Sequence, residues 1–144
     1  MKEVSIYTDG ACRGNPGKGG WGAILVYKGL ERELSGGEAE TTNNRMELSA
    51  VIAALSALKE PCEVTLTTDS QYVVNAIEKG WLATWQKNGW KKSDRGAVLN
   101  ADLWQKLVVL LEKNDFSFVW VRGHNGDPYN ERCDKLATEY ADSL

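Results

Sequence analysis

The chain has 144 residues and a formal net charge of −3, with a pI near 5.2. This length predicts one domain, residues 1–144, with a substantial core, and the overall charge excludes a global positive field that would gather polyanions. The first predicted strand begins at residue 4 and no apolar stretch approaches the roughly 20 residues that span a bilayer, so we expect a soluble, cytoplasmic protein that binds no membrane.

The first predicted strand covers residues 4–9. Alternation places its β-branched residues on one face, namely Val4, Ile6 and Thr8. The strand ends by presenting the carboxylate of Asp9 beside Gly10, where an α/β protein usually builds its site. Taken alone, Asp9 is more typical of a turn ahead of a glycine. Its chemical role therefore depends on the other acids of the chain.

A glycine-rich segment, residues 10–20, follows the first strand and turns the chain back. The apolar run 21–27 is typical of a hairpin partner. The polar run 30–35 suits an edge strand, which the next two glycines end. These three strands predict an antiparallel meander.

A helix is predicted between Asn44 and Pro61, because its apolar residues follow a 3-4-3 spacing, with Leu48, Val51, Leu55 and Leu58 in one stripe. Glu47 shares that core-facing stripe one turn nearer the N-terminus. An acid on an apolar helix face either takes part in a functional site or stabilises the backbone of its own helix. The local alternative is a capping box with Asn44 as N-cap and Glu47 at N3.

A short alternating run, residues 63–68, repeats the pattern of the first strand and delivers Asp69 at its end. Because it follows a helix, it should lie parallel to the first strand through a right-handed crossover. Asp9 and Asp69 would then lie side by side. The alternative for Asp69 is the N-cap of the next helix, residues 70–78.

The segment 81–99 is predicted to form a basic protrusion. Three of the six tryptophans lie within ten residues, Trp81, Trp85 and Trp90. From Lys79 to Arg95 five basic residues face one acid, a local charge of +4 in a chain of −3. Aromatic and basic residues in alternation suit a surface that tracks a nucleic-acid backbone. The alternative is that the tryptophans belong to the core and the lysines to an ordinary solvated face.

The C-terminal third predicts a helix that begins at Asn100 or Asp102, then a last strand at 116–121. A glycine-flanked loop containing His124 leads to a final helix, on which Asp134 shares a face with small residues. Small neighbours imply close packing around this acid. The alternative for His124 is an exposed loop residue without a role, and the alternative for Asp134 is a solvated aspartate on the helix surface.

The element order predicts an α/β fold with a mixed five-stranded sheet, three antiparallel meander strands plus two parallel strands, and helices on both faces. Asp9, Glu47, Asp69 and Asp134 would converge, at a cost of several kilocalories unless cations bind there. The three cysteines match no zinc spacing, and oxygen ligands favour Mg²⁺ or Mn²⁺. Two such ions about 3.5–4 Å apart typically serve in-line attack on a phosphodiester.

Five motifs, in order along essentially the whole chain, resemble those of bacterial type I ribonuclease H. They are Tyr7-Thr8-Asp9-Gly10, Gly14-Asn15-Pro16-Gly17, Thr41-Thr42-Asn43-Asn44-Arg45-Met46-Glu47, Thr68-Asp69-Ser70-Gln71, and Gly123-His124 with Asn130-Glu131-Arg132-Cys133-Asp134. The resemblance implies a monomeric endonuclease that hydrolyses the RNA strand of RNA·DNA hybrids and leaves 5′-phosphate and 3′-hydroxyl ends. It also implies two Mg²⁺ ions, with Mn²⁺ as a substitute, held by the four carboxylates, and His124 in proton transfer or product departure.

The resemblance further implies three sets of substrate contacts. The residues that match minor-groove contacts, where 2′-hydroxyls distinguish RNA from DNA, are Asn15, Asn43, Asn44 and Gln71. Thr42 and Asn100 match a pocket for a DNA phosphate. The stretch that matches the basic protrusion contributes Trp81, Trp85, Lys87, Trp90, Lys91 and Lys92. One departure weakens the pocket: Glu40 stands where relatives commonly place an arginine.

Two rival classes remain open from the residues. A hybrid-binding module of the same fold without cleavage would gain nothing from clustered acids near phosphates. A two-metal nuclease or strand-transferase acting on DNA, of the integrase-like kind, typically uses three acids and lacks the segment 81–92. A glycosidase with paired carboxylates would not need four acids.

Overall fold

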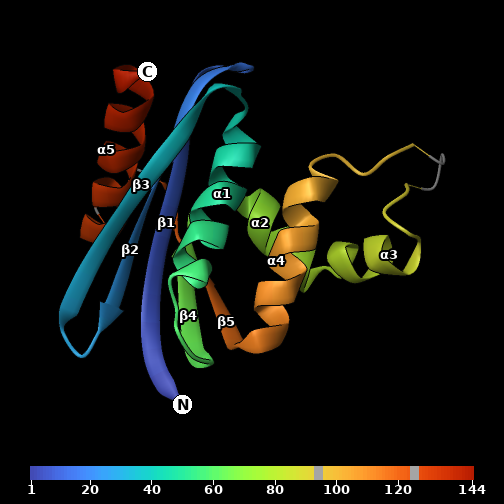
Figure 1. Ribbon diagram of the computed structural model, residues 1–144, viewed down its shortest axis with the longest axis horizontal. Helices are drawn as coiled ribbons and strands as arrows, with labels where there is room; N and C mark the ends of the chain where they lie inside the picture. The colour runs from blue at the N-terminus through green and yellow to red at the C-terminus, as the bar shows by residue number, and fades with distance from the viewer. Residues whose placement is uncertain (93–95, 124–126) are drawn as a thin grey trace.

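The computed structural model describes residues 1–92, 96–123 and 127–144. Within them the chain forms strands and helices in one succession (Figure 1). The strands are β1 (Lys2–Gly14), β2 (Gly17–Tyr27), β3 (Leu30–Thr41), β4 (Cys62–Thr68) and β5 (Asp115–Trp120). The helices are α1 (Asn43–Ser56), α2 (Gln71–Glu78), α3 (Trp81–Lys87), α4 (Ala101–Lys113) and α5 (Pro128–Ser143).

The strands join in one sheet in the order β3-β2-β1-β4-β5. The pairs β1–β2 and β2–β3 are antiparallel, whereas β1–β4 and β4–β5 are parallel. The predicted meander, the parallel crossover through α1 and the mixed sheet are therefore confirmed. The parallel strands run toward the same edge of the sheet, which is where ligands bind in open α/β sheets.

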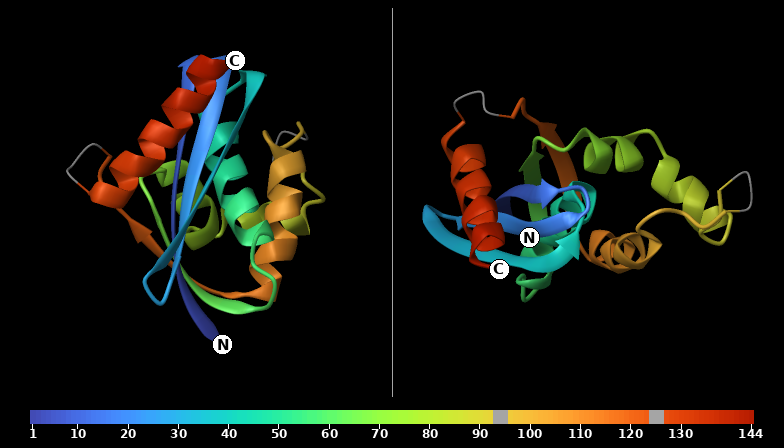
Figure 2. Two further views of the ribbon diagram at one scale, coloured as in Figure 1. Left: turned by 60° about the vertical axis from the view of Figure 1, so that its left-hand side comes forward. Right: turned by 90° about the horizontal axis from the view of Figure 1, so that it is seen from above.

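Helices cover both faces of the sheet, as predicted. α5 crosses the face formed by β1, β2 and β3, whereas α1 lies on the opposite face with α4 packed against it (Figures 1 and 2). The main core lies on the α1 side and includes Ile6, Leu48 and Leu66, all fully buried. Alternation along β1 was correctly predicted, because Val4, Ile6 and Thr8 are its buried face.

Glycines let the two covering helices approach the sheet backbone. A Cβ on Gly22 would lie 2.5 Å from the Cys133 carbonyl oxygen of α5, and a Cβ on Gly10 would lie 2.6 Å from the Glu47 nitrogen of α1. Because real Cβ atoms do not approach backbone so closely, these positions require glycine. α1 and α5 therefore both pass close to the sheet at the level of Asp9.

All three meander strands are longer than predicted, and β2 already begins at Gly17. β1 continues past Asp9 to Gly14, because residues 10–14 keep pairing with β2 as far as Gly14↔Gly17. β3 likewise continues through its two glycines to Thr41. Glycine weakens a strand but does not forbid it where a neighbour supplies the ladder. The interpretation of Asp9 as a turn residue is thus wrong, since it lies within a strand.

Three helix starts differ from the local alternatives. The side chain that caps α1 is Thr42, which accepts a hydrogen bond from the Arg45 N–H, so the capping box from Asn44 to Glu47 does not form. Ser70 rather than Asp69 caps α2. Asn100 does precede α4, but with left-handed backbone and, within the described residues, without a side-chain cap bond. Glu47 and Asp69 are thereby free for another role.

Candidate active site

Strand register brings Asp9 and Asp69 together. The parallel ladder between β1 and β4 ends at the pair Thr8↔Thr68, and each aspartate is the next residue along its chain segment. Both carboxylates therefore lie at the point where the ladder between these two strands ends. The predicted side-by-side placement is confirmed.

Glu47 completes the group from the first turns of α1, where the missing side chain of Gly10 admits the helix. One carboxylate oxygen of each of Asp9, Glu47 and Asp69 lies within 4.8 Å of the others. Asp9 and Glu47 are each only 4% exposed. We call these three residues the carboxylate cluster.

Burial and mutual repulsion raise the proton affinity of the carboxylate cluster. Burial first, and then the charge of Asp69, raise the pKa of Asp9 to about 8. The pKa of Glu47 is also raised well above its usual range, by burial and then by the charges of Asp9 and Asp69. At neutral pH the cluster therefore favours protons unless another cation compensates its charge.

The donor atoms of the cluster fit a divalent cation. Glu47 Oε2 is buried and has no hydrogen-bond partner among residues 1–92, 96–123 and 127–144, an arrangement that costs free energy unless a ligand satisfies it. Asp9 Oδ1 accepts a 2.9 Å hydrogen bond from the Gly10 N–H, which orients its carboxylate. An oxygen-only set of this kind suits Mg²⁺ or Mn²⁺ rather than zinc.

The cluster opens into a cleft of roughly 540 Å³. Asp134 of α5 lines this cleft, but among the described residues it lies outside the 4.8 Å group. The small residues that share its helix face, Ala137 and Ala141, are fully buried, whereas Asp134 itself is half-buried. His124 lies outside the described residues. The structure thus brings together three of the four predicted acids and places the fourth on the wall of the same cleft.

Most of the predicted minor-groove residues lie at this cleft as well. Asn43, Asn44 and Gln71 line it. Asn15, in the connection between β1 and β2, accepts a 3.2 Å hydrogen bond from the N–H of Asn43. Amide side chains from three segments of the chain are therefore gathered beside the carboxylates.

Thr42 and Asn100 are joined by an arginine that the sequence analysis did not single out. Arg45 donates to the Asn100 side-chain oxygen at 3.3 Å and to both oxygens of Asp102 at 3.0 and 2.9 Å, and its backbone N–H donates to Thr42. The Asn100 amide nitrogen in turn donates to the Tyr72 hydroxyl. The guanidinium thus lies beside Asn100, one of the two predicted phosphate contacts, although a carboxylate already engages it.

The basic protrusion divides into packed and exposed parts. The Trp85 ring lies 5.6 Å from that of the buried Trp104, and Trp90 also packs against the core. The core alternative therefore holds for these two tryptophans. Trp81 is 41% exposed, and the lysines of the segment, Lys87, Lys91 and Lys92, are exposed. α3 lies farther from the sheet than the other helices (Figures 1 and 2).

Sequence analysis missed three further residues that line the cleft, Tyr72, Trp120 and Arg122. Trp120 pairs with Thr68 in the parallel register, and its indole N–H donates to the Asp69 carbonyl oxygen at 3.1 Å. The repeated strand pattern carried a signal for Trp120, because the parallel ladders of β1 with β4 and of β4 with β5 end at the same level, at Thr8, Thr68 and Trp120.

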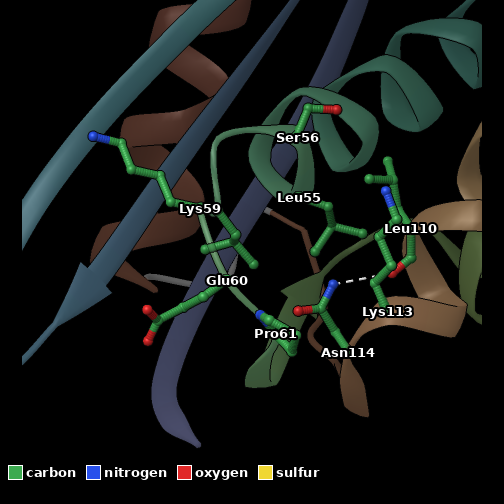
Figure 3. A pocket seen from close by; sticks show the side chains of 9 residues that line it. Leu55, Ser56, Lys59, Glu60, Pro61, Leu110, Lys113 and Asn114 are labelled. Carbon is green, nitrogen blue, oxygen red and sulfur yellow. Dashed lines mark hydrogen bonds between the residues drawn. The ribbon is translucent and has the colours of Figure 1, made fainter.

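A second hollow, of roughly 400 Å³, lies between the C-terminal ends of α1 and α4. Figure 3 shows Leu55 and Asn114 facing it, while the side chain of Lys59 extends away. Asn114 uses its amide to hold the Leu110 carbonyl oxygen at 3.0 Å. Its lining carries one acid, Glu60, so the convergence of acids seen in the cleft is not repeated at this hollow.

Comparison with known proteins agrees with this geometry. The RNase H family model matches residues 1–142. The chain is 63% identical over 139 residues to a ribonuclease H of Nitratidesulfovibrio vulgaris (strain DP4), covering 96% of this chain and 89% of that protein. It is 57% identical over 144 residues to a ribonuclease H of Alcanivorax borkumensis, covering 100% of this chain and 95% of that protein.

Solved structures extend the likeness to three dimensions. LC9-RNase H1, described as a type 1 RNase H with the type 2 active-site motif, superposes with a TM-score of 0.88 at 34% identity, covering 99% of this chain and 74% of that one. LC11-RNase H1 in complex with an RNA/DNA hybrid superposes with a TM-score of 0.72 at 27% identity, covering 97% of each chain.

Proposed function

The chain belongs to the ribonuclease H family, and from this premise we propose that its cleft hydrolyses the RNA strand of RNA·DNA hybrids, leaving 5′-phosphate and 3′-hydroxyl ends. The observation that carries the proposal is the carboxylate cluster, three acids within 4.8 Å where the parallel ladder between β1 and β4 ends. Such a cluster is costly as a purely structural feature, because burial and repulsion both oppose its charges. A bound cation would compensate the charges of the cluster and would take part in phosphodiester hydrolysis, which gives the cluster a function.

Asp9, Glu47, Asp69 and Asp134 would hold two Mg²⁺ ions, with Mn²⁺ as a substitute. When bound, such ions supply an activated water and charge stabilisation at the scissile phosphate. Asp9 and Glu47 must release protons to become ligands, because their metal-free pKa values are raised. Asp134 would approach the ions from the wall of the cleft formed by α5. His124 would carry a proton during bond cleavage or product departure.

The cleft supplies the contacts that would recognise the RNA strand. LC11-RNase H1 has been solved with a hybrid, and Asn43, Asn44 and Gln71 line this chain's cleft beside the carboxylate cluster. Amide groups donate to and accept from a ribose 2′-hydroxyl, the feature that distinguishes RNA from DNA. Asn15 would hold this wall in place through its hydrogen bond to Asn43.

The DNA strand would be held by two separate surfaces. Thr42, Asn100 and the guanidinium of Arg45 would receive a phosphate, with Asp102 as a competing anion. The exposed lysines of the protrusion and the ring of Trp81 would track the same strand further along. Trp85 and Trp90 would act by holding the protrusion to the core rather than by contacting substrate.

We further propose that the enzyme acts as a monomer in the cytoplasm and folds as one domain. None of the helices in the described part of the chain combines the length and apolar character that membrane crossing requires. The proposals concerning compartment and oligomeric state rest on the sequence expectations stated above.

The decisive experiment compares matched 5′-labelled RNA·DNA, RNA·RNA and DNA·DNA duplexes, each with and without Mg²⁺. Cleavage of only the RNA strand of the hybrid, and only with the ion, is expected. Binding of the hybrid without cleavage would favour the non-cleaving module. Cleavage of DNA·DNA would favour the integrase-like class.

A further inference from the structure

Aromatic stacking joins the first turn of α5 to the sheet. The rings of Tyr7 on β1 and Tyr129 on α5 lie 4.2 Å apart between centroids, with an angle of 12° between their planes. The Tyr129 hydroxyl donates a 3.0 Å hydrogen bond to Glu31 on β3. One side chain of α5 thus contacts two strands of the sheet at once.

Charged groups reinforce this attachment. Arg132 lies over the Tyr129 ring, 5.5 Å from its centroid, and donates to Glu31 at 2.7 Å and to Glu33 at 3.0 Å. Hydrogen bonds from Arg132 and then from Tyr129 lower the pKa of Glu31 below its usual value, so Glu31 stays charged. The ring of Tyr129 is therefore held by both Tyr7 and Arg132.

This attachment lies directly beside the catalytic cleft. Tyr7 shares a face of β1 with Asp9, two residues further along the strand. On α5 the Cys133 thiol donates to the Tyr7 carbonyl oxygen at 3.3 Å, and Asp134 is the next residue. The stacked pair therefore joins the strand that carries Asp9 to the first turn of α5, and Asp134 lies on the next turn.

The fourth acid differs from the other three in how it is held. Asp9 and Asp69 are fixed by the register of adjacent strands, and Glu47 by the contact of α1 with Gly10. Asp134 depends on the position of α5 alone, and among the described residues it lies outside the 4.8 Å group. The distance between Asp134 and the carboxylate cluster is therefore set by whatever fixes the N-terminal turns of α5.

We propose that Tyr129 is a positioning residue for the metal site: its ring, stacked on Tyr7, fixes the helix turn that presents Asp134 to the carboxylate cluster. Tyr129 acts through Asp134 and contacts neither substrate nor ion. The inference rests on the proposed role of Asp134 as a metal ligand. It predicts that loss of the ring weakens Mg²⁺ binding, whereas loss of the hydroxyl alone does not.

The chain offers a matched control on the same helix. Tyr140 is another tyrosine of α5, on the C-terminal side of Asp134, and packs on β3 at Gly37, where a Cβ would lie 2.8 Å from its ring. Tyr129→Ala and Tyr140→Ala each remove one ring from the contact between α5 and the sheet. Tyr129→Phe keeps the stack and removes only the hydrogen bond to Glu31.

Two readouts separate positioning from stability. The first is the rise in melting temperature on addition of Mg²⁺ to the substrate-free protein, and the second is the Mg²⁺ concentration at half-maximal hybrid cleavage. We expect Tyr129→Ala to need roughly tenfold more Mg²⁺ in both, as when a group that orients a metal ligand is removed. We expect Tyr129→Phe and Tyr140→Ala to match the wild type in Mg²⁺ requirement, whatever their melting temperatures without Mg²⁺.

The outcomes that contradict the inference are distinct from those that contradict the proposed function. If Tyr129→Ala melts at a lower temperature but keeps the wild-type Mg²⁺ requirement, Tyr129 is a structural residue only. If Tyr129→Phe is as impaired as Tyr129→Ala, the hydroxyl rather than the ring is responsible, and the stacking role is overturned. A wild-type protein that neither binds Mg²⁺ nor cleaves hybrid would instead overturn the function itself.

Discussion

The carboxylate cleft and the basic protrusion are built on opposite principles. In the cleft, strand register and a glycine contact fix buried acids, and Asp9 and Glu47 are only 4% exposed. In the protrusion, Lys87, Lys91 and Lys92 are exposed on a short helix and the segment after it. Burial makes each charge in the cleft costly and strongly coupled, whereas solvent screens those of the protrusion. The cleavage rate should therefore depend on individual carboxylate atoms in the cleft. The affinity for the hybrid should depend on the total charge of the protrusion.

The largest expected effect follows from Asp9→Asn, which removes one ligand from the cleft. We expect cleavage to fall by at least about a thousandfold, because the substitution removes charge stabilisation worth several kilocalories. The fold should persist, since Asn keeps the shape and relieves repulsion. The gain in stability without metal should grow from about pH 4 to about pH 8 and level off above it. Cleavage rates at saturating Mg²⁺ measure the loss of activity, and chemical denaturation measures the gain in stability. Activity within tenfold of the wild type would contradict the assignment.

His124→Ala should have the next largest effect. A positioned acid–base group typically contributes about a hundredfold, so turnover should fall substantially without reaching zero. The Michaelis constant should change little, because the hybrid contacts remain. Steady-state kinetics on a fixed hybrid provide the measurement, and an unchanged turnover number would leave His124 as a loop residue without a role.

For substitutions in the protrusion we expect the opposite pattern, in which the Michaelis constant changes and turnover does not. Replacing Lys87, Lys91 and Lys92 together by Ala should raise the Michaelis constant on the order of tenfold at low salt, with turnover at saturation preserved. The slope of log affinity against log salt should flatten by roughly one unit for each phosphate that the variant no longer neutralises. The matched control is a triple replacement of exposed lysines that do not line the cleft, at Lys28, Lys59 and Lys113. A slope equal to that of the wild type would show that the protrusion does not touch substrate.

The smallest effect concerns Glu40, exposed near the end of β3 and two residues before Thr42. Because an exposed charge is screened, Glu40→Arg should tighten hybrid binding only about threefold, and most at low salt. Glu3→Arg, which makes the same charge change at the opposite end of the sheet, is the control. Fluorescence anisotropy with an Asp9→Asn background, which blocks cleavage, gives the affinity directly. Equal affinities for both variants and the wild type would make Glu40 a neutral surface residue.

Sequence reasoning recovered the parts of the site that follow from local periodicity. The alternation in β1 and β4 placed Asp9 and Asp69 at matching strand positions, and the helical stripe placed Glu47 toward the core. The fold followed from the same patterns, because a crossover helix between two apolar strands forces them to be parallel.

Features decided by longer-range contacts escaped prediction. The glycines of residues 10–14 suggested a turn, but pairing with β2 keeps them in a strand. The choice of Thr42 over Asn44 as helix cap depends on where β3 ends, which is set by its register with β2. Arg45 and Trp120 acquire their roles only through partners distant in sequence, Asp102 and Asp69. Period and spacing do not encode such pairs.

The raised pKa of Asp9 gives the cleft a pH dependence that the protrusion lacks. Its pKa is about 8 in the folded chain against 3.8 without the fold. The folded protein therefore holds a proton that the unfolded chain releases, and stability without metal is fully present below about pH 4 and lost as pH rises through about 8. Glu47, whose pKa shifts in the same direction, adds to this loss. Thermal melts in EDTA between about pH 4 and pH 8 should show a melting temperature that falls as the pH rises. The fall should be smaller in Asp9→Asn.

The most direct test of the account is calorimetric titration of Mg²⁺ into the substrate-free protein at pH 7, in two buffers of different ionisation enthalpy. If the carboxylate cluster is a cation site, Mg²⁺ must displace protons from Asp9 and Glu47, so the apparent binding enthalpy will differ between the buffers. The difference should shrink in Asp9→Asn. Binding that is identical in both buffers and unaffected by Asp9→Asn would place Mg²⁺ elsewhere and contradict the account.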